Sequence, residues 1–178
     1  MRLTSDIILY HKNWERADDE LCNEASIGLF ARLVDLFLVA CAIGIMDDKS
    51  SEVPEELILE NPKNIGRSTY QSIANTDLYD TLDFMLQNAI LNSNTIDLDE
   101  DERLKLAFDP EYNNKKISPV NFLVGFANYG LEKIYEKIDS KASIVAIDEL
   151  YKFFNSLTLS RYDDLLANFT IEDLKSNQ

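Results

Sequence analysis

Residues 29–46 read LFARLVDLFLVACAIGIM, an apolar run in a chain of 178 residues that carries 32 acidic and 17 basic side chains. Arg32 and Asp35 are the only charged residues in this run. A helix that is apolar on every side must be enclosed, either by lipid or by the other elements of a fold. The choice between these two environments decides the class of protein.

The run is too short and too charged to be a good membrane span. A spanning helix needs about 20 predominantly apolar residues, whereas the uncharged part of the run, residues 36–46, has eleven. Arg32 and Asp35 can pair on one helix face, and both would be costly in hydrocarbon. Asp47 and Asp48 follow directly, without a flanking basic cluster. We therefore expect no membrane association and a central buried helix over about residues 28–45.

The composition indicates one folded domain. Hydrophobic residues make up 46% of the chain and aromatic residues 10%, well above the content of disordered segments. Five glycines and four prolines are too few for a turn-rich β-sandwich or barrel. The predicted fold is all-α, a single compact domain of about five to seven helices over residues 18–170. Residues 1–17 are expected to form an N-terminal arm or short element, and residues 171–178 a tail.

Apolar spacing and capping signals predict the other helices. The expected helices cover about residues 76–91, 100–108, 119–138 and 143–157, with a last short one near 161–169. In the helix over 100–108 the apolar pair is Leu104 and Phe108. In the helix over 143–157 the side chains expected to point inward are Ile144, Ile147, Leu150, Tyr151 and Phe154.

Three segments leave their local structure open. Residues 7–10 have strand-like character, but an arm or a short helix fits them equally well. Residues 47–66 contain two prolines and predict an excursion with at most a short turn near 55–60. Gly125 and Gly130 each cost about 1 kcal/mol relative to alanine within a helix. They therefore predict either a close approach of two helices or a break near residues 128–130.

The cysteine content favours a reducing, cytoplasmic setting. Only Cys22 and Cys41 occur, and we expect no signal peptide before them. Cys41 lies in the apolar run and is expected to be a small buried hydrophobe. A disulfide is compatible with two cysteines but is not implied by them.

The net charge of −15 is spread along the chain and is not gathered in a tail. There is no basic patch, so this chain alone is not expected to bind a nucleic-acid backbone. The ordinary meaning of the acidic excess is a solvated surface. Two more specific explanations of the acidic excess are a partner protein with a basic surface and mimicry of the charge of DNA.

No motif predicts catalysis, a cofactor or a metal. His11 is the only histidine, and a partly exposed structural histidine is the expectation for it. No nucleophile elbow, phosphate loop or dinucleotide fingerprint occurs. The acidic run from Asp97 to Glu102 begins like a calcium loop, but Glu102 and Phe108 stand where that loop needs glycine and glutamate. We expect the run to begin a helix, where acids are favoured; a weak divalent-ion site is the alternative.

Aromatic side chains are the candidates for a partner interface, because such residues dominate binding hot spots. Tyr151 and Phe154 fall on the apolar face of their predicted helix, which favours a core role for them. Phe153 lies off that face. The candidate interface residues are Tyr10, Trp14, Tyr129 and Phe153.

Three segments carry a resemblance to a known family. Residues 39–44, VACAIG, and 126–131, FANYGL, together with the helix LYDTLDFM at 78–85, resemble small helical proteins associated with bacterial DNA phosphorothioation (Dnd) and phage-defence systems. Those proteins show an FAAxLG helix end and a later YANGGL segment, and the match covers about residues 28–138. Cys41 and Tyr129 stand where small residues are commoner. The resemblance implies an accessory protein, without assigned catalytic residues, that works beside a nuclease, a helicase or an SMC-like ATPase.

Three functional hypotheses follow. The leading one is a non-catalytic accessory subunit that docks through an aromatic-centred patch onto a larger, partly basic protein. The second is an acidic DNA-mimic inhibitor of a nucleic-acid-binding protein, which requires carboxylates in regular rows. The third is an enzyme that uses carboxylates with tyrosine or lysine, which requires a concave pocket of convergent acids.

Overall fold

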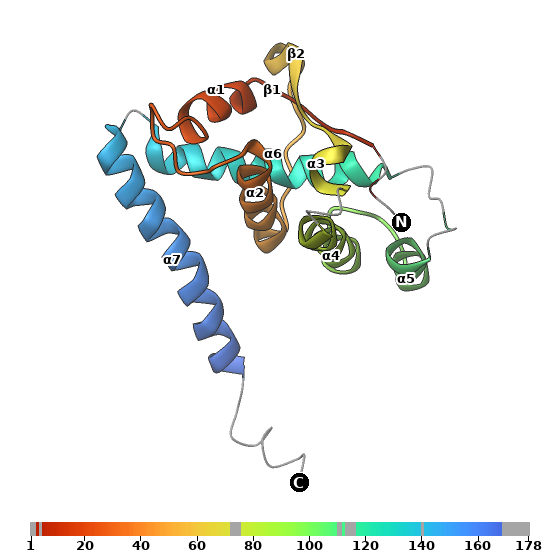
Figure 1. The fold of residues 1–178 in the computed structure, drawn as a ribbon. Helices are drawn as coiled ribbons and strands as arrows, with labels where there is room; N and C mark the ends of the chain where they lie inside the picture. The colour runs from red at the N-terminus through yellow and green to blue at the C-terminus, as the bar shows by residue number, and fades with distance from the viewer. Residues whose placement is uncertain are drawn as a thin grey trace. The chain divides into compact units, whose positions relative to one another are not determined.

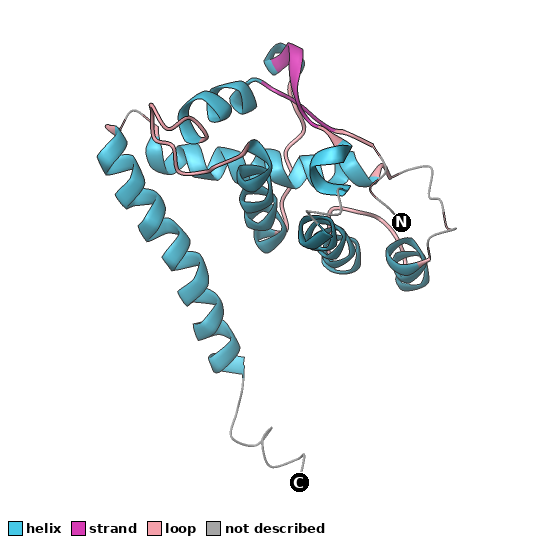
Figure 2. Ribbon diagram, in the orientation of Figure 1, coloured by secondary structure: helices cyan, strands magenta, loops and turns pink. Residues whose placement is uncertain are grey.

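A computed structural model describes residues 3, 5–71, 76–109, 112, 117–139 and 141–168, with side chains described up to residue 157. Within these residues the chain has seven α-helices, one short 3-10 helix and two β-strands (Figures 1 and 2). The mostly helical character is confirmed, but the all-α prediction is wrong in detail because the two strands pair into a sheet. The chain divides into two compact units, Met1–Ile134 and Tyr135–Gln178, each described by itself below.

The first unit contains most of the elements. In chain order they are β1 (Ile7–His11), α1 (Lys12–Leu21), α2 (Leu33–Asp47), the 3-10 helix η1 (Glu55–Leu57), β2 (Ile58–Ile65), α3 (Arg67–Gln71), α4 (Thr76–Asn92), α5 (Glu100–Phe108) and α6 (Pro119–Ile138). The last turn of α6 belongs to the second unit, which also holds α7 (Ser143–Asn168). The boundary expected at residues 17 and 18 falls inside α1, because β1 and α1 form a continuous structured start to the chain.

The apolar run forms α2, and its side chains supply much of the core of the first unit. The helix begins at Leu33, because Arg32 has an extended backbone and acts as the N-cap residue. Arg32 Nη2 lies 2.7 Å from Asp35 Oδ1, which confirms the predicted pair. The helix was predicted over about residues 28–45, but it continues to Asp47 and ends where Asp48 adopts a left-handed conformation with φ of 49°. No described helix is long and apolar enough to cross a membrane.

A close crossing of α2 and α6 explains Gly44 of α2 and Gly130 of α6 (Figure 1). A Cβ atom on Gly44 would lie 2.2 Å from the carbonyl oxygen of Phe126, and one on Gly130 would lie 1.8 Å from that of Ala40. These distances are far below van der Waals contact, so the two backbones approach where only glycine fits. Of the two alternatives for Gly130, the close approach is confirmed, and α6 runs unbroken through it.

The chain contains a two-stranded antiparallel sheet. Strand β1 confirms the strand alternative for residues 7–10, whereas β2 replaces part of the excursion predicted over residues 47–66. Ile7 pairs with Ile65, Leu9 with Lys63, and His11 with Ile58. The pairing is irregular between Leu9 and His11, where residues 59–62 of β2 lie opposite the single residue Tyr10. Pro62, which has no amide hydrogen, falls within this irregular part, where a regular ladder bond is not required of it.

The helices α4 and α5 follow the predicted pattern, with one correction. The buried residues of α5 are Leu106 and Ala107, whereas Leu104 and Phe108 are exposed. The acidic run before α5 forms a capping box, in which the Asp99 side chain accepts from the Glu102 amide and the Glu102 side chain accepts from the Asp99 amide. Helix initiation, as predicted, therefore accounts for this part of the run.

Candidate functional site

The four aromatic residues predicted to form an interface differ in their local surroundings. Tyr10, Trp14 and Tyr129 belong to the first unit, and Phe153 belongs to the second. Tyr10 lies on β1 with 46% of its surface exposed, and Tyr129 lies half-buried on α6. Trp14 is fully buried. An interface centred on all four is therefore not what the fold presents.

Trp14 is a core residue, so its assignment as an exposed interface anchor is wrong. It shares the buried side of α1 with Ala17 and Leu21, at the three- and four-residue spacing of a helix face. Its ring centre lies 6.0 Å from that of Phe37 on α2. Its indole Nε1 donates to Asn128 Oδ1 at 2.8 Å, which satisfies the one polar atom of the buried ring.

His11 is likewise buried rather than partly exposed, with 4% of its surface accessible. Its Nδ1 accepts a hydrogen bond from the Asn13 amide at 3.0 Å and so caps α1. Burial lowers the pKa of His11 below its ordinary value, and the nearby charge of Glu132 acts in the opposite direction. Only the neutral imidazole has an unprotonated Nδ1 that can accept this hydrogen bond from Asn13.

Tyr129 forms part of a small polar cluster on the first unit. Its hydroxyl donates to Asp47 Oδ2 at 3.0 Å, just past the end of the apolar run. The ammonium groups of Lys49 and Lys133 lie 5.8 and 5.4 Å from the centre of its ring. These are cation–π distances, so the ring already has partners within the chain.

The second unit presents the clearest candidate surface, along one side of α7. Ile144, Ile147 and Tyr151 expose 82%, 39% and 68% of their surfaces. Their spacing of three and four residues places them on one helix face, and we call these three residues the α7 stripe. Val145, which is 45% exposed, lies at its margin. Ile144, Ile147 and Tyr151 were predicted to point inward, and for these three residues the prediction is wrong.

The buried side of α7 is a different one. Ala146 and Leu150 are fully buried, at the same three-to-four spacing but on another face of the helix. Phe153 lies on the opposite side of α7 from Tyr151 and is half-buried, with its ring centre 5.7 Å from that of Phe154. Lys137 Nζ stands 5.3 Å from the Phe153 ring centre. Phe153 is therefore not part of the α7 stripe.

Paired charges border the stripe. Lys152 Nζ lies 2.6 Å from Asp148 Oδ2 and 3.3 Å from Glu149 Oε1, and Lys141 Nζ lies 3.2 Å from Glu149 Oε2. The hydrogen bonds from Lys141 and Lys152 lower the pKa of Glu149. The two bases balance the two acids, so the margin of the stripe is close to neutral in a chain whose net charge is −15. Charged residues are depleted at the centre of a protein interface, and none of the three residues of the α7 stripe is charged.

The signal for this surface was present in the sequence but ambiguous. Helix α7 carries two apolar series, one through Ala146 and Leu150 and the other through Ile144, Ile147 and Tyr151. The residues predicted to point inward combine Leu150, which is buried, with Ile144, Ile147 and Tyr151, which are exposed. Periodicity alone does not say which of two apolar faces the rest of the fold covers.

The other candidate chemistries find no assembled site in the described part of the chain. Within it, no three histidine, cysteine, aspartate or glutamate side chains are grouped so as to hold a metal ion. Cys22 and Cys41 are both free thiols. Cys41 is fully buried, as predicted, and burial raises the pKa of its thiol. Comparison with known proteins finds no matching protein family, no characterised relative and no similar solved structure.

Proposed function

We propose that this chain is a non-catalytic accessory subunit that binds a larger protein through the α7 stripe. The observation that carries the proposal is the exposure of Ile144 and Tyr151, at 82% and 68%, on one face of a single helix. Apolar anchors spaced by three and four residues are the ones that a helix presents to a hydrophobic groove. The expected partner surface is therefore an apolar groove that accepts one helix face.

The free energy of burying apolar side chains favours a complex in which a partner covers the α7 stripe. Full burial of a large apolar side chain contributes about 1.5–3 kcal/mol relative to leaving it in water. Ile144 and Tyr151 gain little of this within the chain, since most of their surface is exposed. A partner groove would recover that free energy, and the neutral margin formed by Asp148, Glu149, Lys141 and Lys152 would add little desolvation of unpaired charge.

The biological setting is the second part of the proposal. The resemblance of residues 39–44 and 126–131 to proteins of DNA phosphorothioation and phage-defence systems supports a bacterial defence or DNA-modification context. In that context the larger partner is a nuclease, a helicase or an SMC-like ATPase. The support for this setting is the resemblance alone, whereas the support for a protein partner is the exposed stripe.

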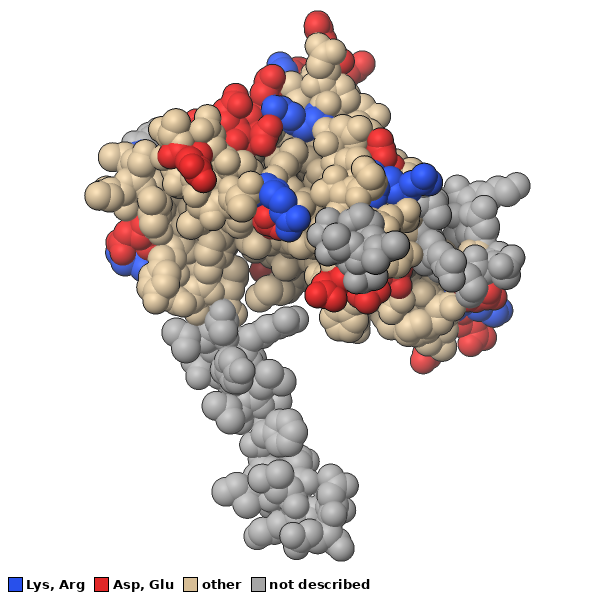
Figure 3. All heavy atoms as spheres, viewed as in Figure 1, with Lys and Arg blue, Asp and Glu red and all other residues tan. Residues whose placement is uncertain are grey.

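The distribution of charge favours this function over DNA mimicry. Acidic and basic side chains lie among one another on the face shown in Figure 3. Arg16 pairs with Glu20 at 2.9 Å, and Lys63 with Asp18 at 2.8 Å. Each such pair interrupts the row of uncompensated carboxylates that an imitation of DNA phosphates requires.

The test is affinity capture of the tagged full chain from the cells in which its gene resides. The test variant is Ile144→Gln with Tyr151→Gln, which removes the stripe but keeps good helix formers and adds no charge. The matched control is Phe84→Gln with Leu104→Gln, which changes two exposed apolar residues on α4 and α5. We expect a stoichiometric partner with the wild type and the control, and its loss with the test variant. Equal recovery by all three chains, or no stoichiometric partner, would contradict the proposal.

A further inference from the structure

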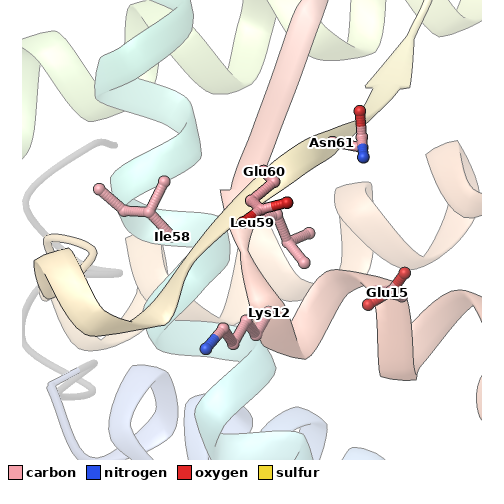
Figure 4. A pocket seen from close by; sticks show the side chains of 6 residues that line it. All are labelled: Lys12, Glu15, Ile58, Leu59, Glu60 and Asn61. Atoms are coloured by element: carbon pink, nitrogen blue, oxygen red, sulfur yellow. The ribbon is translucent and has the colours of Figure 1, made fainter.

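A second surface lies between the start of α1 and the irregular part of β2. It is a groove of about 350 Å³ (Figure 4). The groove is lined by Lys12, Glu15, Ile58, Leu59, Glu60 and Asn61. It belongs entirely to the first unit, far along the chain from the α7 stripe.

The strand at this groove is only partly paired. Strand β2 pairs with β1 alone, and the described residues supply no third strand. Residues 59–61 belong to the segment opposite Tyr10, outside the regular register. An edge strand with unsatisfied pairing is a template for an added strand from another chain.

The charge of the groove selects the kind of segment that would fit. Glu15 comes from α1 and Glu60 from β2, and Glu52, Glu55 and Glu56 precede the strand. Lys63 lies near Glu15, but its Nζ pairs with Asp18 Oδ2 at 2.8 Å. Lys12 also lines the groove, but its Nζ donates to the carbonyl oxygen of Glu56 at 2.9 Å. The apolar part of the groove wall is formed by the side chains of Ile58 and Leu59. Ile58 is 44% exposed.

We propose that this groove binds an extended, arginine-containing segment of a partner protein, added as a strand beside β2. The aliphatic part of an arginine would pack on Ile58 and Leu59, and its guanidinium would meet the carboxylates of Glu15 and Glu60. Arginine suits both walls, because it joins an apolar stem to a planar group with several donors for carboxylates. The inference extends the proposed function, since a protein partner would supply the segment. Its test uses synthetic peptides, so its failure leaves the α7 stripe untested and the two can be judged separately.

The experiment measures fluorescence anisotropy of a labelled peptide of alternating valine and arginine titrated with the full chain. The test variant is Glu15→Gln with Glu60→Gln. The control is Glu24→Gln with Glu100→Gln, which removes the same charge from exposed positions elsewhere. A second peptide carries N-methyl groups on alternate valines, which block strand pairing but leave the arginines unchanged.

We expect saturable binding that weakens about tenfold in the test variant, because two charge-assisted contacts are lost, and less than about twofold in the control. The N-methylated peptide is expected to bind about tenfold more weakly than its parent, because strand addition relies on main-chain hydrogen bonds. Equal weakening by the test and control variants would show that only net charge attracts the peptide. That result, equal affinity for both peptides, or the absence of saturable binding would overturn the proposal.

Discussion

Arg103 is the residue on which the connection between α4 and α5 depends. Its guanidinium and Nε donate to backbone carbonyl oxygens at 2.7–3.0 Å, and the acceptors are Ile90, Ser93, Ile96 and Leu98. Two of these carbonyls belong to the end of α4 or the residue after it, where a helix leaves acceptors unsatisfied. One side chain therefore closes the helix and shapes the loop that follows.

Replacing Arg103 with lysine is expected to destabilise the first unit despite the retained charge. A lysine ammonium cannot reproduce the fork that reaches several carbonyls at once. Charge-assisted hydrogen bonds contribute about 1.5–3 kcal/mol each, so Arg103→Lys should lower the free energy of unfolding by about 2–3 kcal/mol in urea titration. The control is Arg16→Lys, which alters an exposed pair with Glu20 and should change stability by less than about 0.5 kcal/mol. Equal stability of the two variants would contradict the role of Arg103.

His11 predicts a dependence of stability on pH. Burial lowers its pKa in the folded chain relative to the ordinary value of 6.5. The folded state therefore binds this proton less readily than the unfolded state, so the contribution is fully present above pH 6.5 and is lost as the pH falls through the folded pKa. The substitution His11→Asn retains a capping acceptor without titrating. We expect the free energy of unfolding of the wild type, relative to that of the variant, to fall as the pH is lowered from 7.5 to 5.5. A difference that does not change with pH would contradict this prediction.

The crossing of α2 and α6 brings two helix backbones into close approach. A Cβ atom on Gly130 would overlap the carbonyl oxygen of Ala40, whereas one on Gly125 would meet only the Ser50 side chain, at 3.2 Å from its Cβ. The same substitution at two positions of one helix therefore separates packing from helix propensity.

We expect Gly130→Ala to lower the free energy of unfolding by about 1–3 kcal/mol or more, because one backbone must move away from the other. Gly125→Ala should be close to neutral, since a gain of about 1 kcal/mol in helix propensity offsets a tight contact with an exposed loop residue. Thermal and urea unfolding of the two variants measure this difference. The crossing would be looser than described if both variants matched the wild type.

Elements with one apolar face and clear end signals could be predicted from the sequence. Helix α6 begins at Pro119 after Ser118, and α5 begins after the capping box of Asp99. The buried face of α7 could not be predicted, because the helix carries two apolar series and the sequence does not show which one the fold covers. Strand β2 could not be recognised, because its pairing with β1 is non-local and interrupted, and such a strand shows no clean alternation.

The candidate site was predictable only as a class. An interface of exposed aromatic residues was expected, but three of the four residues chosen already have contacts within the chain. Trp14 bonds to Asn128, Tyr129 bonds to Asp47, and Phe153 meets Phe154. Aromatic residues serve cores and interfaces alike, so residue type without burial does not separate the two roles.

At the scale of the whole molecule, the segments that carry the family resemblance coincide with the helix crossing. Residues 39–44 include Ala40 and Gly44, and residues 126–131 include Phe126 and Gly130, the residues whose backbones meet. The resemblance therefore lies in residues that pack two helices against each other. The proposed functions belong to surfaces outside that crossing, namely the α7 stripe and the groove beside β2.

The stripe variant is expected to separate stability from association. Because Ile144 and Tyr151 are largely exposed, Ile144→Gln with Tyr151→Gln should change the free energy of unfolding by less than about 0.5 kcal/mol per site. Partner capture should nevertheless be lost. Urea unfolding of the purified variant provides the stability measurement. A large loss of stability would assign these side chains to the core of the chain.

Photo-cross-linking at Tyr151, in the cells in which the gene resides, tests whether the α7 stripe binds a protein partner. The substitution Tyr151→p-benzoylphenylalanine places a reactive group on the stripe, and Phe84→p-benzoylphenylalanine places the same group on α4, at a position that is 65% exposed. We expect one discrete heavier product from position 151 that contains a second protein, and none from position 84. No product from position 151, a cross-link only within the same chain, or the same products from both positions would contradict it.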